Sequence, residues 1–152
     1  MDIKADIIYS WNQNNKVTLY LLDHIEEDWL SIKLDNKGRS IGEQLVHINN
    51  IRSFWINKVG EKMDLKIDKK YAKDKLKLKN ALLFSSEKMG STLSQLFEQE
   101  TIKGFKPHST AFYTQIIAHE AHHRGQIMTI VARNNLSISK SVNFGLWSWS
   151  NK

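Results

Sequence analysis

Two histidines four residues apart are the residues of this chain whose types and spacing best suit chemistry. His119 and His123 lie in the run 119–126, which reads His-Glu-Ala-His-His-Arg-Gly-Gln. Residues four apart lie on the same face of an α-helix, so two imidazole rings at this spacing can share a metal ion. Imidazole suits zinc, nickel, copper and iron, so the ligand type narrows the choice of metal without fixing it.

The sequence around this pair has helical periodicity. At about 100° per residue, both histidines share one third of the helical wheel with four apolar residues, namely Phe112, Ile116, Ile127 and Ile130. His122 falls to one side of this sector and Glu120 to the other. A lone histidine on an apolar face is most often a core side chain, but two in register favour a metal pair. The third ligand has to come from elsewhere in the chain.

The composition limits what can surround such a site. The chain has 152 residues, 41% of them hydrophobic, enough for one domain over 1–152. It has no cysteine, which excludes disulfides, thiolate ligands and a cysteine nucleophile. The N-terminus lacks the order of a secretory signal, and no run approaches the roughly 18 apolar residues of a membrane span. We therefore expect a cytoplasmic protein with no membrane partner.

The elements that position the histidines are predicted to be helices. One proline and seven glycines argue against a chain of tight turns, and apolar residues recur at helical spacing. We predict an all-α fold of four long helices, which suits a four-helix bundle. The fourth helix begins at Ser109 or Thr110 and ends at Asn134 and Asn135. A short irregular tail over 136–152 is expected to fold its aromatic residues back over the bundle; they are Phe144, Trp147 and Trp149.

The first two helices follow from the same patterns. The first is predicted over 6–29, with Asn14 and Asn15 in the middle of its apolar stripe. The second begins at Ser40, because Ser40 and Glu43 have the spacing of a capping box. Tryptophans at helical spacing are expected in the core rather than at a cofactor; they are Trp11, Trp29 and Trp55.

A lysine-rich connection over 58–79 leads to the third helix, which is predicted to end near Gly104, and Pro107 closes the next linker. The chain has a net charge of +6, which invites a nucleic-acid partner. However, the lysines of the connection alternate with acidic residues, and no groove-reading motif accompanies them. We therefore expect a solvated surface and no nucleic-acid partner.

A bundle of this size, with one histidine in its second helix and His-x-x-x-His-Arg-Gly-Gln in its fourth, resembles the DinB/YfiT-like metalloproteins over nearly the whole chain. The resemblance implies that three histidines bind a divalent metal at one end of the bundle. By position these are His47, His119 and His123, with zinc or nickel as the expected metal. It also implies a homodimer that forms through bundle helices. His24 and His108 are expected at the surface or near helix ends instead.

The residues that follow the histidine pair are expected to have supporting roles. Gln126 lies on the inward flank and can hydrogen-bond a ligand imidazole, which would fix its tautomer. Gly125 is expected to permit the close approach of a neighbouring helix. Arg124 points more outward and is interpreted as a surface charge. Glu120 is a candidate general base.

The same run also satisfies His-Glu-x-x-His, the helix motif of zinc proteases in which the glutamate is the general base. Such an enzyme needs a third ligand downstream of the helix. After His123 the chain offers no further histidine and no acidic residue. The sequence therefore does not support a protease.

Three neutral imidazoles leave a metal its full charge and an open position, which is a catalytic type of coordination. The resemblance implies a transferase or isomerase that uses a low-molecular-weight thiol such as bacillithiol or mycothiol. Our leading hypothesis is a metal-dependent enzyme that activates a thiol for attack on a small-molecule substrate. Metal-dependent hydrolysis with Glu120 as proton acceptor is the alternative enzyme. A non-catalytic metal-binding or stress-response interaction protein is the other class.

Overall fold

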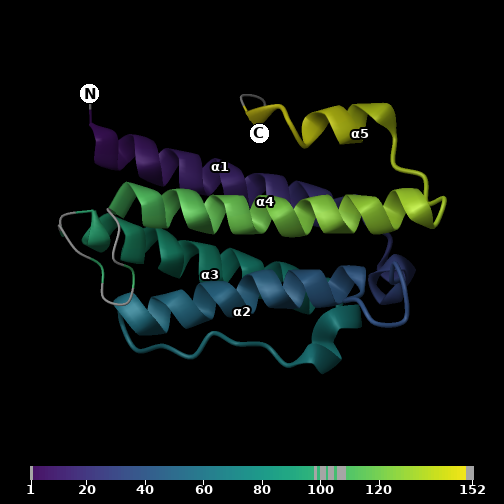
Figure 1. Cartoon of the computed structure of the whole chain (residues 1–152), viewed down its shortest axis with the longest axis horizontal. Helices are drawn as coiled ribbons and strands as arrows, with labels where there is room; N and C mark the ends of the chain where they lie inside the picture. The colour runs from purple at the N-terminus through teal and green to yellow at the C-terminus, as the bar shows by residue number, and fades with distance from the viewer. Residues whose placement is uncertain (1, 98, 100–101, 103–104, 106–108, 150–152) are drawn as a thin grey trace.

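The computed structural model describes residues 2–97, 99, 102, 105 and 109–149. Four long helices form the bundle, and three shorter helical segments accompany them (Figure 1). In chain order they are α1 (Ile3–Asp23), η1 (Glu27–Ser31), α2 (Ile41–Val59), η2 (Lys69–Lys73), α3 (Lys75–Leu96), α4 (Ser109–Arg133) and α5 (Lys140–Gly145). Within the described ranges the only β-type pairing is an isolated bridge between Ile102 and Phe105. The prediction of an all-α four-helix bundle is confirmed.

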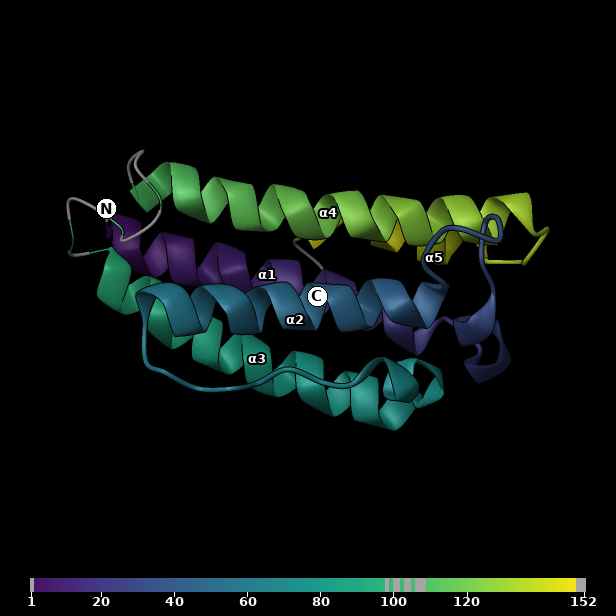
Figure 2. The ribbon, with the colours of Figure 1, turned by 60° about the horizontal axis from the view of Figure 1, so that its bottom comes forward.

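The long helices run in two parallel pairs. α1 and α4 point one way along the bundle, and α2 and α3 point the other way (Figures 1 and 2). Both α1 and α2 pack against α3 and against α4. Because α2 and α3 are parallel, the chain between them has to return along the whole bundle, and the segment 60–68 does so beside α2 (Figure 2).

Side chains of α2 hold this returning segment. The Asn49 amide donates to the carbonyl of Leu65 at 2.8 Å, and the hydroxyl of Ser53 accepts from the Leu65 N–H at 3.0 Å. Asn50 both donates to the Ile67 carbonyl at 3.0 Å and accepts from the Ile67 N–H at 2.9 Å. These bonds satisfy backbone groups that have no partner strand or helix.

Capping residues decide where several helices begin. Ser40 and Glu43 form the predicted capping box, with Ser40 accepting from the Glu43 N–H and Glu43 accepting from the Ser40 N–H. Asp74 accepts from the Lys77 N–H at 2.8 Å, so α3 begins inside the lysine-rich connection rather than after it. α3 ends at Leu96, earlier than predicted, and Gly104 and Pro107 lie outside the described residues.

The first helix is shorter at its C-terminal end than predicted. α1 ends at Asp23, and Trp29 lies in the separate turn η1. The break lets both Ile25 and Leu30 enter the core. On one straight helix, residues five apart point about 140° away from each other, so the two side chains would not face the same core. The sequence pattern did not show this change of direction.

The C-terminal tail is more regular than predicted. α4 ends at Arg133, and Asn135 has a φ of 54°, the left-handed conformation that closes a helix. The Leu136 N–H then donates to the Val131 carbonyl, completing the turn. The tail returns along the bundle and contains the short helix α5, which runs beside α1 (Figure 1).

The tail contacts the bundle through aliphatic residues, not through the aromatic residues expected to do so. Phe144 and Trp147 are 72% and 82% exposed, so that prediction is wrong for both, whereas Trp149 is partly buried. Gly145 lies close against the ring of Tyr20. The tail residues that pack on the core are Leu136, Ile138 and Leu146.

A polar layer divides the core in two. One apolar cluster includes Leu45 and Ile127, and the other includes Trp11 and Phe112. Each long helix contributes buried polar or charged side chains between them, which include Asn14, Asn15, Thr18, Arg52, Ser85, Glu120 and Arg124. The asparagines that interrupt the apolar stripe of α1 belong to this layer.

Candidate metal centre

Three histidines from two helices lie together on one side of this layer. His47 comes from the second turn of α2, and His119 and His123 come from the middle of α4. One ring nitrogen of each lies within 4.8 Å of the others. Because α2 and α4 are neighbours, the structure brings together residues 72 positions apart in the chain (from 47 to 119). These are the residues that the family resemblance implied.

Two glutamine side chains fix the ring of His123. Its Nδ1 lies 2.7 Å from the Oε1 of Gln44 and 3.0 Å from the Oε1 of Gln126. Both partners are acceptors, so we assign the hydrogen to Nδ1. The Nε2 atom then carries a free lone pair, and it lies 3.0 Å from the Nε2 of His119. The expected hydrogen bond between Gln126 and a ligand imidazole is present, with Gln126 as the acceptor. The contact of Gln44 with the same ring was not predicted from the sequence.

A contact with His122 explains how the side-chain amide of Gln126 is oriented. Its Nε2 lies 2.9 Å from the Nε2 of His122, an exposed residue. Donation from the amide N–H₂ to His122 turns the amide oxygen toward His123. His122 thus borders the site without belonging to the three-histidine cluster.

The surroundings favour neutral imidazoles. Burial is the main cause that lowers the pKa of His47 to about 4, and the positive charge of Arg39 adds to it. Burial and the neighbouring rings of His119 and His47 lower the pKa of His123 to about 4. Burial also lowers the pKa of His119, although the negative charge of Glu120 opposes this. Near pH 7 the cluster therefore presents nitrogen lone pairs, which a divalent cation requires.

Glu120 lies in the polar layer, and other residues occupy both its oxygens. Arg52 donates from Nε to Oε1 at 2.6 Å and from Nη2 to Oε2 at 2.8 Å, and Asn14 donates to Oε2 at 2.7 Å. The residue is 1% exposed. These contacts hold Glu120 in the polar layer, and the role of general base stays a prediction.

Arg124 is buried, contrary to the interpretation as a surface charge. It is 9% exposed, donates to the hydroxyl of Thr18 at 2.9 Å and lies 3.9 Å from Glu120. Burial lowers its pKa, and the Glu120 charge opposes that effect. A helical wheel missed this because the long side chain of a residue at the edge of a stripe can reach the interior.

The prediction for Gly125 is also wrong. A Cβ at this position would meet nothing within 4 Å, so none of the described helices approaches closely there. The close approach occurs instead at Gly42, where a Cβ would overlap the backbone carbonyl of Ala72. Gly42 thus allows η2 to pack on the first turn of α2, near the beginning of the helix that carries His47.

The remaining histidines lie apart from the cluster. His24 caps the C-terminal end of α1, is exposed, and its Nδ1 lies 2.8 Å from the carbonyl of Tyr20. This agrees with the surface position expected for it. His108 lies outside the described residues.

Two cavities adjoin the cluster on the surface between α2 and α4. One, of about 270 Å³, is lined by Gln44 and Gln126, the two residues that hold His123. The other, of about 210 Å³, is lined by His119 itself. Since Gln44 precedes His47 in α2 and the second cavity includes residues after it, the two cavities lie on opposite sides of the histidines along the helices.

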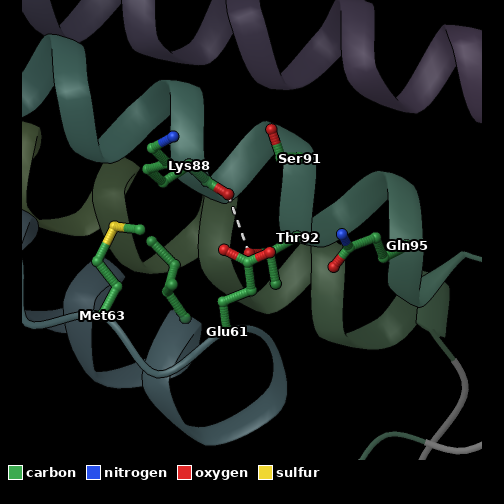
Figure 3. Close-up of a pocket in the computed structure, with 7 residues that line it drawn as sticks. Glu61, Met63, Lys88, Ser91, Thr92 and Gln95 are labelled. Atoms are coloured by element: carbon green, nitrogen blue, oxygen red, sulfur yellow. Dashed lines mark hydrogen bonds between the residues drawn. The ribbon is translucent and has the colours of Figure 1, made fainter.

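A cavity elsewhere in the bundle lacks comparable chemistry. It has about 240 Å³ and lies between α3 and the start of the returning segment (Figure 3). The Thr92 hydroxyl on its wall donates to the carbonyl of Lys88 at 2.9 Å, as the dashed line in Figure 3 shows. Ser91 likewise donates to the Glu87 carbonyl at 3.2 Å. Both hydroxyls are thus engaged with their own helix, and no histidine lines this cavity.

Comparison with known families agrees with this architecture. The model of the DinB family matches residues 1–133. The chain belongs to the DinB family. In this DinB protein the match covers all four long helices and the three histidines of the cluster. No curated protein and no solved structure matches it. None of its described helices has the length and apolar character needed to cross a membrane.

Several lysines of the lysine-rich connection have partners within the protein. Lys69 lies 3.0 Å from Glu43, and Lys79 lies 2.7 Å from Asp23. Lys75 donates to the carbonyl of Ile25 at 2.6 Å. These contacts give the lysines a local role, in line with the expectation of no nucleic-acid partner, which stays a prediction. The homodimer also stays a prediction.

Proposed function

We propose that this DinB protein is a metal-dependent enzyme that holds a divalent cation, zinc or nickel, at His47, His119 and His123 and activates a low-molecular-weight thiol. The observation that carries the proposal is the cluster of three neutral imidazoles with ligand atoms within 4.8 Å. A bound divalent cation would supply positive charge that lowers the pKa of a thiol and so favours the nucleophilic thiolate.

The chain's own residues support this chemistry in two ways. Gln44 and Gln126 hold the Nδ1–H of His123, so that Nε2 stays available as a ligand atom. The positive charge of Arg39, which acts on His47 and His119, adds a field that favours a thiolate over a thiol. In the reaction the thiol proton would pass to solvent, and the sulfur would form the new bond to the electrophilic carbon while the bond between that carbon and its leaving group breaks and the leaving group departs with the electron pair.

Hydrolysis of a small substrate ranks behind thiol transfer. It needs a group to accept a proton from water, and Glu120 was the candidate from the sequence. Both oxygens of Glu120 accept hydrogen bonds from Arg52 and Asn14. A thiol, by contrast, loses its proton near neutral pH once its pKa is lowered, and therefore needs no dedicated base.

Metal content measured by mass spectrometry on purified untagged protein tests the site. We expect near-stoichiometric zinc or nickel in the wild type and its loss in His47→Ala and in His123→Ala. His24→Ala, the same change at an exposed histidine outside the cluster, is the matched control and should keep the metal. Metal retained in the His47 variant would mean that another residue is the third ligand.

Thiol transfer to 1-chloro-2,4-dinitrobenzene tests the reaction. In this reaction the carbon–sulfur bond forms and chloride leaves, which gives an absorbance change. The metal-loaded wild type should accelerate transfer from at least one member of a panel of small thiols, and His119→Ala should abolish the acceleration. Turnover that persists in the His119 variant would contradict the proposal, and no turnover in a fully loaded wild type would favour a non-catalytic metal-binding protein.

A further inference from the structure

The two cavities beside the histidines differ in chemistry. The cavity next to Gln44 and Gln126 contains both charges of the two linings, Arg39 and Asp35, and the polar Thr129, beside the apolar Leu34 and Ile130. The cavity next to His119 is lined mainly by apolar and aromatic side chains, namely Ile51, Phe54, Trp55 and Ile116, with Gln115 as its other polar residue. A reaction between two substrates requires that both be held next to one reactive centre, and two cavities on either side of that centre can do this.

Arg39 gives the first cavity a free positive charge. It is exposed and forms no ion pair with any residue in the described part of the chain. Its cavity adjoins the cluster, because Gln44 and Gln126 line the same cavity and contact the ring of His123. An anionic group in this cavity would therefore lie within reach of the guanidinium while the rest of the ligand reaches the histidines.

Asp35 lines the same cavity and carries the opposite charge, but its carboxylate is engaged. One oxygen accepts from the N–H groups of Lys37 and Gly38, each at 2.8 Å. Lys33 is also close enough to lower the pKa of this carboxyl. The turn closed by Asp35 holds the backbone immediately before Arg39, so Asp35 orders the loop that presents the guanidinium.

The second cavity suits an apolar group. The Trp55 ring is fixed by the ring of Phe112 at a centroid distance of 5.0 Å, and Phe54 packs against Trp55 at 5.2 Å. Lys58 is the nearby cation, and its ammonium lies over both of those rings, at 5.3 Å from Phe54 and 5.2 Å from Trp55. The ammonium thus interacts with the faces of these two rings and is not part of the cavity lining.

We infer that the two cavities divide the substrates by chemistry: the Arg39 cavity binds the anionic part of a carboxylate-bearing thiol, and the Trp55 cavity binds the apolar part of the electrophile. The inference rests on the proposed function, since it assigns places to the two reactants of that reaction. With the thiol tail on one side of the histidines and the electrophile on the other, the sulfur and the carbon that it attacks meet at the cluster.

Binding of two thiol probes to zinc-loaded protein tests this division without any turnover. Mercaptosuccinate has an anionic tail, and benzyl mercaptan has an apolar one. Both would bind the zinc through the thiol, so the tail alone determines which cavity each probe occupies. Dissociation constants from titration calorimetry are compared for wild type, Arg39→Gln and Phe54→Ala. Lys58→Gln removes one positive charge from a residue that lines neither cavity and is the matched control. Each variant is first shown to hold zinc as the wild type does.

We expect Arg39→Gln to weaken mercaptosuccinate binding about fivefold, the upper range for a solvent-exposed charge pair, and to leave benzyl mercaptan unchanged. Lys58→Gln should leave both thiols unchanged. Phe54→Ala should weaken benzyl mercaptan about threefold, because the ring loses part of its apolar contact, and should not affect mercaptosuccinate.

Two failures can be told apart. If zinc binds but neither thiol does, the proposed thiol chemistry fails and the inference fails with it. Suppose instead that both thiols bind. If Arg39→Gln weakens the binding of both thiols equally, weakens mercaptosuccinate no more than Lys58→Gln does, or changes neither dissociation constant, the assignment of the cavities is wrong and the proposed function stands. An equal effect of Phe54→Ala on both probes would overturn the assignment of the Trp55 cavity in the same way.

Discussion

Arg52 and Glu120 form a doubly hydrogen-bonded ion pair at the centre of the bundle, with N–O distances of 2.6 and 2.8 Å. The pair joins α2 to α4 close to the histidines, since Arg52 lies five residues after His47 and Glu120 directly follows His119. Arg52 also donates to Asn15 of α1 and to the Leu82 carbonyl of α3. One guanidinium therefore helps to set the register of all four helices.

Removing the charge of Glu120 should be strongly destabilising. In Glu120→Gln, Arg52 would lose the only carboxylate that contacts it in the described part of the chain, and Arg124 would lose the negative charge that lies 3.9 Å away. We expect a loss of about 3 kcal/mol in the free energy of unfolding, because two buried cations would remain without compensation. Urea denaturation measures it. The exposed pair Lys79–Asp23 is the comparison: Lys79→Gln should cost less than about 1 kcal/mol, and equal losses would contradict the argument.

The two glutamines that hold His123 should control metal affinity without being ligands. Loss of both amide oxygens in Gln44→Leu/Gln126→Leu should weaken metal binding by about 10- to 100-fold, since the ring would be free to rotate or change tautomer. Each single change should have a smaller effect, because the other oxygen still accepts from Nδ1. Competition with a chromogenic chelator measures the affinity. Gln95→Leu on α3 is the control, and an unchanged double variant would rule out this role.

Much of the site could be predicted because its signals are local. His119 and His123 are one helical turn apart, so periodicity alone places them on one face, and the capping box at Ser40 locates the start of α2. His47 needed the family resemblance, since a single histidine in a helix carries no such signal. Gln44 precedes His47 by about one turn and contacts His123 of α4, and its place one turn from a candidate ligand is the signal in the sequence that points to it.

The polar layer was harder to predict because its partners are distant in the chain. Asn14 and Asn15 visibly interrupt an apolar stripe, but their partners Glu120 and Arg52 are 106 and 37 residues away. Pattern analysis treats each helix separately and therefore reads a buried charge as an exposed one. The burial of Arg124 was missed because its long side chain reaches inward from the edge of the stripe to Thr18, 106 residues away in the chain. The contacts of Glu120 with Arg52 and Asn14 were missed because those partners also lie on other helices.

The stability of the metal-free protein should depend on pH through the histidines. The pKa of His47 and of His123 is about 4 in the folded protein and 6.5 ordinarily, so between these values the unfolded chain binds more protons. The contribution is therefore fully present above pH 6.5 and is lost as the pH falls toward 4. We expect the melting temperature of metal-free wild type to fall between pH 6.5 and 5.

A variant comparison assigns this pH dependence to the cluster. His47→Gln/His123→Gln removes two of the three histidines whose pKa is lowered and should reduce the change in melting temperature between pH 6.5 and 5. His24→Gln, at the exposed end of α1, should retain the wild-type slope. The same slope in all three proteins would show that other groups cause it.

Replacing Gly42 or Gly125 with alanine should change the free energy of unfolding in opposite directions, because a Cβ has a close neighbour at the first position and none at the second among the described residues. In Gly42→Ala the new Cβ would overlap the backbone carbonyl of Ala72. Because neither the Cβ nor this carbonyl can rotate away, η2 would have to move away from α2. We expect a loss of at least about 2 kcal/mol. In Gly125→Ala the Cβ enters open space in the middle of α4, and the better helix former should add roughly 1 kcal/mol. Urea denaturation of both variants decides the matter: a destabilised Gly125→Ala would mean that the outer face of α4 is covered in solution.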